Sequence, residues 1–168
     1  MASKTPDKKS TSTRRKASDQ SSPQDAIALL KADHRQVEEW FAEFEQTRSD
    51  NKKLKLATSI CQALTVHTTI EEEIFYPAFL EATDETDLHH EAEVEHSGAK
   101  KLIEEIAASD PDDEYYEAKV KVLSEMIKHH VKEEEQKDGM FAKAKQSEMD
   151  LKALGEEMAQ RKTELMAS

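Results

Sequence analysis

A histidine interrupts the apolar stripe of each of four successive segments, and this recurrence constrains the fold and chemistry more than any other feature of the chain. Apolar residues recur at spacings of three, four and seven within residues 23–44, 52–80, 86–108 and 110–139, as expected for helices with one buried face. The histidines on these stripes are His34, His67, His96 and His130. Because burying an imidazole without a partner is costly, four of them on four helices require a common partner.

The scarcity of chain-breaking residues sets the fold class. Three glycines and four prolines in 168 residues are too few for the turns of a sheet protein. The 36% of hydrophobic and 36% of charged residues suit long amphipathic helices. The chain is therefore predicted to be all-α, with one domain and tails.

The two ends of the chain differ from its middle. Residues 1–22 are rich in Ser, Thr, Lys and Arg and hold no large apolar side chain after Met1, so they cannot offset the entropy of ordering. We predict a disordered basic tail for residues 1–22, a helical bundle for residues 23–145 and a C-terminal helical extension for residues 146–168. The extension is expected to pack on the bundle or to form a homodimer contact, through Leu151, Leu154, Met158 and Leu165.

Charge and composition exclude several classes of function. The net charge is -12 although the first residues are basic, so nucleic acid is an unlikely ligand except through the N-terminal tail. No run of about 18 apolar residues is present, so no membrane span is expected. Cys61 is the only cysteine, which excludes a disulfide framework and favours a reducing, cytoplasmic location.

Two carboxylates complete the pattern of inward-facing histidines. Glu71 follows His67 by four residues, and Glu134 follows His130 by four, so each pair lies on one helix face. Four imidazoles and two bridging carboxylates would give each of two metal ions two nitrogens and two oxygens. These ligands suit iron, zinc or manganese, whereas the absence of cysteine ligands disfavours iron–sulfur clusters and soft copper sites.

Two further glutamates point near the same volume. Glu38 lies one turn beyond His34, and Glu93 lies three residues before His96. Each is a candidate for an additional ligand or for a hydrogen-bond partner that orients an imidazole. Spacing alone is a weak signal, because five of the seven histidines have a glutamate four residues later. The stronger evidence for a metal site is that four histidines lie on the apolar stripes of four different segments.

Helix ends and inward positions follow from local signals. Ser22–Pro23 and Asp110–Pro111 each read as an N-cap followed by proline at the first helical position. Gly139 is expected to end the fourth helix. In the second segment, continued helical periodicity predicts that Ile74 and Ala78 face the core.

The motifs LLKADHRQVEEWF, HTTIEEEIFYP, EVEHSGAKKLI and HHVKEEE resemble the four helices of the hemerythrin-like HHE cation-binding family. The resemblance covers about residues 25–145 and implies an up-down four-helix bundle holding a non-haem di-iron centre, with two iron ions. Carried onto this chain, it implies four terminal histidine ligands and two bridging glutamates: His34, His67, His96, His130, Glu71 and Glu134.

The resemblance also implies a range of functions. Oxygen-carrying hemerythrins have a second histidine where this chain has Lys100, and an aspartate where it has Glu135, which disfavours reversible oxygen storage. We expect a centre that binds or reacts with dioxygen, peroxide or nitric oxide in stress response or sensing; if it is an enzyme, it reduces peroxide or oxygen. The alternatives are an iron-storage or sensor module without turnover, and a zinc-stabilised helical interaction protein.

Overall fold

The computed structural model describes residues 24–168, and every regular element in this range is helical. The elements are α1 (Ala26–Gln46), α2 (Asp50–Ile70), η1 (Glu71–Phe75), α3 (Tyr76–Thr83), α4 (Thr86–Ala107), α5 (Tyr116–Glu135), α6 (Met140–Gln146) and α7 (Leu151–Ala167). The predicted all-α class is confirmed. The predicted basic tail, residues 1–22, and the helix start predicted at Ser22–Pro23 lie outside the described residues.

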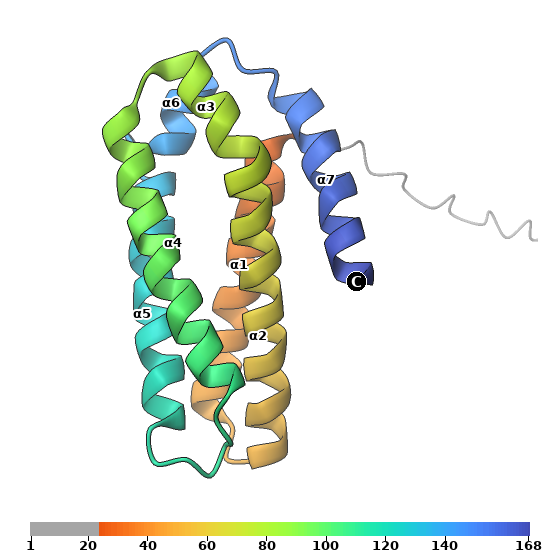
Figure 1. The fold of residues 1–168 in the computed structure, drawn as a ribbon, viewed down its shortest axis with the longest axis vertical. Coiled ribbons are helices and arrows are strands. Elements are labelled where there is room, and N and C mark those ends of the chain that lie inside the picture. Colours follow the sequence, from red (N-terminus) through yellow and green to blue (C-terminus); the bar gives the residue numbers. More distant parts are fainter. Residues whose placement is uncertain (1–23) are drawn as a thin grey trace, which may run out of the picture.

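Four long helices form the body of the molecule (Figure 1). α1 packs against α2 and α5, and α4 packs against the same two helices. The α1–α2 and α4–α5 connections lie at one end of the bundle, while α3 and α6 lie at the other (Figure 1). The predicted up-down four-helix bundle is confirmed.

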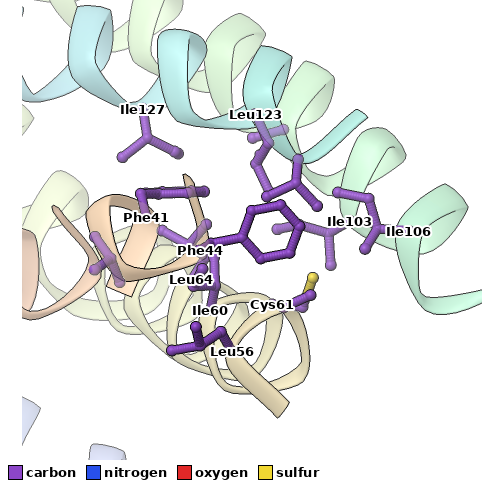
Figure 2. Packing of buried hydrophobic residues seen from close by; sticks show 14 of the residues in the cluster. Phe41, Phe44, Leu56, Ile60, Cys61, Leu64, Ile103, Ile106, Leu123 and Ile127 are labelled. Atoms are coloured by element: carbon purple, nitrogen blue, oxygen red, sulfur yellow. The ribbon is translucent and has the colours of Figure 1, made fainter. Parts of the chain in front are cut away.

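Two hydrophobic clusters fill the bundle, and along α1, α2 and α4 the inward histidine lies between residues of the two clusters. The cluster near the α1–α2 connection, here called the hydrophobic layer, draws side chains from all four long helices, as the side chains labelled in Figure 2 show. A second cluster lies beneath α3, α6 and α7 and is rich in aromatic and methionine side chains. The hydrophobic layer consists of Val37, Phe41, Phe44, Leu56, Ala57, Ile60, Cys61, Leu64, Ala99, Ile103, Ile106, Tyr116, Val120, Leu123, Ile127 and Val131.

A π-helical turn, η1, joins α2 to α3 and corrects one sequence prediction. The widened turn precedes Pro77, which has no N–H to donate and would crowd the carbonyl four residues earlier in a regular α-helix. The extra residue in this turn shifts the buried face of the following residues by one sequence position. Phe75 and Phe79 are therefore fully buried, whereas Ile74 and Ala78, predicted to face the core, are only half-buried.

The structure defines the starts of α1 and α5, and the predicted start of α5 is wrong. α1 has Asp25 as its N-cap, with the carboxylate accepting the Ala28 N–H at 2.8 Å. α5 begins at Tyr116 rather than at Asp110–Pro111, because residues 110–116 form two successive turns. In the second turn the Asp113 carbonyl accepts the Tyr116 N–H at 3.0 Å.

Gly139 begins α6 rather than ending α5, which stops at Glu135. A β-carbon at Gly139 would lie 2.4 Å from the Glu133 carbonyl oxygen and 2.7 Å from that of Glu134. Only glycine lets the chain fold back this closely over the last turn of α5. This return places the Phe141 ring against the His34 ring, with centroids 5.9 Å apart.

α7 lies against the outside of the bundle, beside α1 and α2 (Figure 1). Met158 is fully buried in the second hydrophobic cluster. A β-carbon at Gly155 would lie 2.3 Å from the Gln24 carbonyl oxygen and 2.7 Å from the Asp25 carbonyl carbon, so the two backbones pack closely at the start of α1. Of the two predicted roles for the C-terminal helix, packing on the bundle is confirmed.

Candidate metal centre

Six ionisable side chains meet in the middle of the bundle, between its two hydrophobic clusters. α1, α2, α4 and α5 each contribute one histidine, η1 contributes Glu71, and α5 contributes Glu134. None of the six is more than 4% exposed. The structure thus brings together all six residues that the sequence nominated as ligands.

The six side chains form two groups that share both carboxylates. In the first group, the Nε2 atoms of His34 and His67 lie 3.2 Å apart. Glu134 Oε2 is 3.3 Å from the first of these nitrogens, and Glu71 Oε1 is 3.3 Å from the second.

The second group has the same plan. The Nε2 atoms of His96 and His130 also lie 3.2 Å apart. Glu71 Oε2 is 3.2 Å from His96 Nε2, and Glu134 Oε1 is 3.4 Å from His130 Nε2. Each glutamate therefore gives one oxygen to each group, which is the geometry of a carboxylate that bridges two ions.

The chemistry of this donor set fits a pair of cations. Two carboxylate oxygens of the first group, Glu71 Oε1 and Glu134 Oε2, are buried and make no hydrogen bond. Buried polar atoms without a partner are rare and costly. Imidazole nitrogens and carboxylate oxygens are ligands that suit iron, zinc and manganese.

Four other carboxylates hold the outer nitrogens of the imidazoles. Such partners fix the orientation of the ring and leave Nε2 free to bind a metal. The distances from Nδ1 range from 2.5 to 3.3 Å. The pairs are Glu135 with His34, Asp33 with His67, Glu72 with His96, and Glu95 with His130.

The sequence analysis did not identify these four carboxylates, although their positions in the sequence follow a simple rule. Each is the immediate chain neighbour of a central residue: Asp33 and Glu95 precede His34 and His96, while Glu72 and Glu135 follow Glu71 and Glu134. A residue next to an inward-facing one points along the helix–helix interface, where it reaches the ligand of the adjoining helix. The two halves of the bundle repeat this arrangement.

The predicted additional candidates, Glu38 and Glu93, do not join the centre. Glu38 pairs with Arg35 at 3.4 Å, and Glu93 pairs with His89 at 3.5 Å. Both side chains are at least 36% exposed. The positions expected for them, beside His34 and near His96, are occupied by Glu135 and Glu72.

In the metal-free centre, protonated histidines compensate the charge of the buried carboxylates. Burial disfavours the charged form of His67, but Glu71 and Asp33 outweigh this effect and raise its pKa to about 10. Burial is likewise outweighed at His130, where Glu134, Glu95 and Glu71 raise the pKa to about 9. Without a metal, protonated imidazoles therefore supply the positive charge that the buried carboxylates require.

Tyr76 is a member of the centre that the sequence analysis did not identify. Its hydroxyl lies 3.1 Å from Glu134 Oε1, 3.3 Å from Glu71 Oε2 and 3.2 Å from His96 Nε2. All three atoms belong to the second group, so the hydroxyl makes the two groups unequal. Burial, together with the charges of both glutamates, raises the pKa of Tyr76 well above its ordinary value, so the phenol keeps its proton. The π-helical turn places the ring here, which α-helical periodicity does not predict.

A small cavity adjoins both groups. About 10 Å³ is open to the centre of a water-sized molecule, which is room for a single molecule of that size. Its exposed lining is apolar although all four central histidines border it. The other lining residues are Asp33, Val37, Leu64, Thr68, Ile127 and Val131.

Comparisons with known proteins agree with the fold. Residues 25–142 match the model of the family described as "Hemerythrin HHE cation binding domain". A crystal structure of an HHE cation binding domain-containing protein from Mycobacterium kansasii superposes with a TM-score of 0.66 at 18% identity. The superposition covers 86% of this chain and 88% of that one.

A sequence relative is much longer than this chain. It is a protein of Nostoc sp. named "DNA nickase", which is 31% identical over 107 residues. The match covers 64% of this chain but only 30% of the relative. Within residues 24–168, no helix has the length and hydropathy needed to cross a membrane.

Proposed function

Since the chain belongs to the hemerythrin HHE cation binding domain family, we propose that its central histidines and glutamates bind two iron ions and present them to dioxygen, peroxide or nitric oxide. The bridging geometry carries this proposal, because Glu71 and Glu134 each direct one oxygen to each histidine pair. Non-haem iron bound there would supply electrons and open coordination positions to the small ligand.

The protein's own residues prepare the centre for this role. Carboxylates on the Nδ1 side hold each imidazole so that its Nε2 faces inward. The Tyr76 hydroxyl donates to Glu134 and keeps a proton beside the second group. Phe141 stacks on His34 and Phe75 packs edge-on against Phe141, which excludes bulk water from this end of the centre.

The cavity supports a ligand of a few atoms. Its volume and apolar walls favour a small, weakly polar molecule over a larger organic substrate. An iron-storage function needs room for more than two ions, and this cavity does not provide it. We therefore propose ligand binding or ligand reduction ahead of storage.

Elemental analysis tests the proposal directly. Protein loaded with Fe²⁺ without oxygen and then desalted is expected to keep two irons per chain. His67→Ala and His130→Ala are each expected to lose iron, because each removes one nitrogen from a different group. His90→Ala is the matched control, since its side chain is exposed on α4 away from the centre.

The pattern of loss separates the alternatives. Retention of two irons by His67→Ala would overturn the proposed ligand set. Zinc retained in preference to iron, with no change in absorbance when oxygen or nitric oxide is added, would support the zinc-stabilised interaction protein. Rapid peroxide consumption by the iron-loaded parent, absent from both histidine variants, would identify an enzyme.

A further inference from the structure

Cationic or ionisable side chains surround the four carboxylates that hold the imidazoles. Each carboxylate that holds an imidazole nitrogen also contacts a cationic or ionisable side chain on its outer side. The distances given by the structure are 2.7 Å for Arg35 with Glu135, 2.6 Å for Lys100 with Glu72, and 3.2 Å for His129 with Glu95. These three partners all come from the four long helices of the bundle.

The fourth carboxylate takes its partner from α7. Asp33 accepts a hydrogen bond from Lys162 Nζ through Oδ1, while its Oδ2 lies 3.3 Å from His67 Nδ1. Asp33 is 16% exposed, so this contact is partly shielded from solvent. A path of three side chains therefore connects the C-terminal helix to the centre.

α7 is held firmly enough to transmit this contact. The Arg161 guanidinium pairs with both carboxylate oxygens of Glu73, at 2.6 and 3.0 Å, and this glutamate lies in the π-helical turn that also carries Glu71. Met158 is fully buried beneath the helix, and Gly155 packs against the backbone at the start of α1. The α7 residues in these contacts all lie beyond residue 142, where the match to the family ends.

We propose that α7 contributes to metal binding. Lys162 positions the Asp33 carboxylate, and Asp33 in turn orients the His67 imidazole as a ligand of the first group. Lys162 is a positioning residue, since it touches neither the metal ligands nor a substrate. The inference rests on the proposed function, because it assigns α7 to one of the two proposed iron positions. Lys100 has the corresponding role for the second group, through Glu72 and His96.

Lys162 acts on the first group only, so the proposal predicts an effect on one iron position and not on the other. Without Lys162, Asp33 is free to turn its carboxylate toward solvent, and His67 loses the partner that fixes its ring. Removing a partner that orients a metal ligand typically costs 10–100-fold in metal affinity. Lys162 acts one step further out, so we expect a loss of about tenfold, confined to one iron equivalent.

The experiment is a calorimetric titration of the full, metal-free chain with Fe²⁺ in the absence of oxygen. Lys162→Met is compared with Lys152→Met, which changes an exposed lysine on the same helix. Lys162→Met is expected to weaken one equivalent about tenfold and leave the other unchanged, and Lys162→Arg to restore binding. Lys100→Met is expected to weaken the other equivalent.

Melting of the metal-free variants separates positioning from folding. Lys162→Met and Lys152→Met are expected to have the same melting temperature without metal and to differ in melting temperature only when iron is bound. If these two variants give equal Fe²⁺ titrations while the parent binds two equivalents, the proposed role of α7 is overturned and the proposed function is not. A parent that binds no Fe²⁺ would overturn the proposed function itself.

Discussion

The hydrophobic layer and the candidate centre are equally buried but owe their stability to different interactions. Ile60 and Glu71 are both 0% exposed, yet one is aliphatic and the other is a carboxylate. Burial of Ile60 is favourable without any partner. Burial of Glu71 is unfavourable unless an imidazolium or a metal ion compensates its charge.

This difference separates folding from function within a single bundle. The hydrophobic layer draws side chains from all four long helices (Figure 2) and provides a driving force that depends on neither pH nor metal. The centre adds specific polar contacts at one level of the same helices. We therefore expect substitutions in the two regions to have separable effects on stability and on metal binding.

The largest effect is expected from Glu71→Ala. Glu71 gives one oxygen to each histidine pair, so its loss is expected to abolish binding of both irons. At free metal about 1,000 times the Kd, each lost site removes about 4 kcal/mol of stability. Metal analysis and thermal melting with and without iron measure this, with exposed Glu81→Ala as control. One iron bound with parental affinity would contradict the bridging role.

A large but different effect is expected from Ile60→Ala in the hydrophobic layer. Truncating a fully buried isoleucine typically costs about 2–5 kcal/mol, because transfer free energy is lost and a cavity remains. Urea unfolding is expected to show this loss equally in the metal-free and iron-loaded protein, and the iron content is expected to stay at two per chain. A loss of iron in this variant would show that the two regions are not separable.

The stability of the metal-free protein is expected to depend on pH through the centre and not through the hydrophobic layer. Both His67 and His130 have pKa values raised from 6.5, to about 10 and about 9. Their contribution to stability is therefore fully present below pH 6.5 and is lost as the pH rises through 9 to 10. We expect the difference in unfolding free energy between the parent and His67→Gln to shrink over this window. A constant difference, or the same shrinkage in exposed His90→Gln, would contradict the assignment.

The sequence predicted the parts of the fold that follow a regular period. On α1, α4 and α5, the histidines of the predicted stripes, His34, His96 and His130, are all buried. Helical periodicity needs only local information, so the same stripes that predicted the bundle also located its histidines. The prediction failed for the residues after Glu71, because one π-helical turn shifts the inward face by one position.

The missed residues of the centre depend on contacts between helices. Asp33 and Glu95 hold imidazoles on neighbouring helices, and the period of one helix cannot reveal which neighbour it faces. Lys162 contacts Asp33 across 129 positions of the sequence, so its role required the packing of α7. Glu38 and Glu93 had suitable spacing, but they pair instead with Arg35 and His89, which lie three and four residues earlier on the same helices.

The smallest effect is expected from Tyr76→Phe, and it tests whether the two groups of the centre are unequal. The variant keeps the buried ring and removes only the hydroxyl, which contacts atoms of the second group alone. One hydrogen bond contributes about 1 kcal/mol, so we expect about a fivefold change in one Fe²⁺ equivalent and none in the other. Tyr115→Phe, at an exposed position, is the control.

The affected equivalent can be identified by combining Tyr76→Phe with Lys162→Met. If Tyr76 serves the second group and Lys162 the first, the double variant is expected to weaken both equivalents by the amounts seen in the single variants. Independent effects are expected because Lys162 acts through Asp33 and His67, whereas the Tyr76 hydroxyl contacts neither residue. If both changes weaken the same equivalent, the hydroxyl acts through the shared glutamates on the whole centre, and the two groups are one unit.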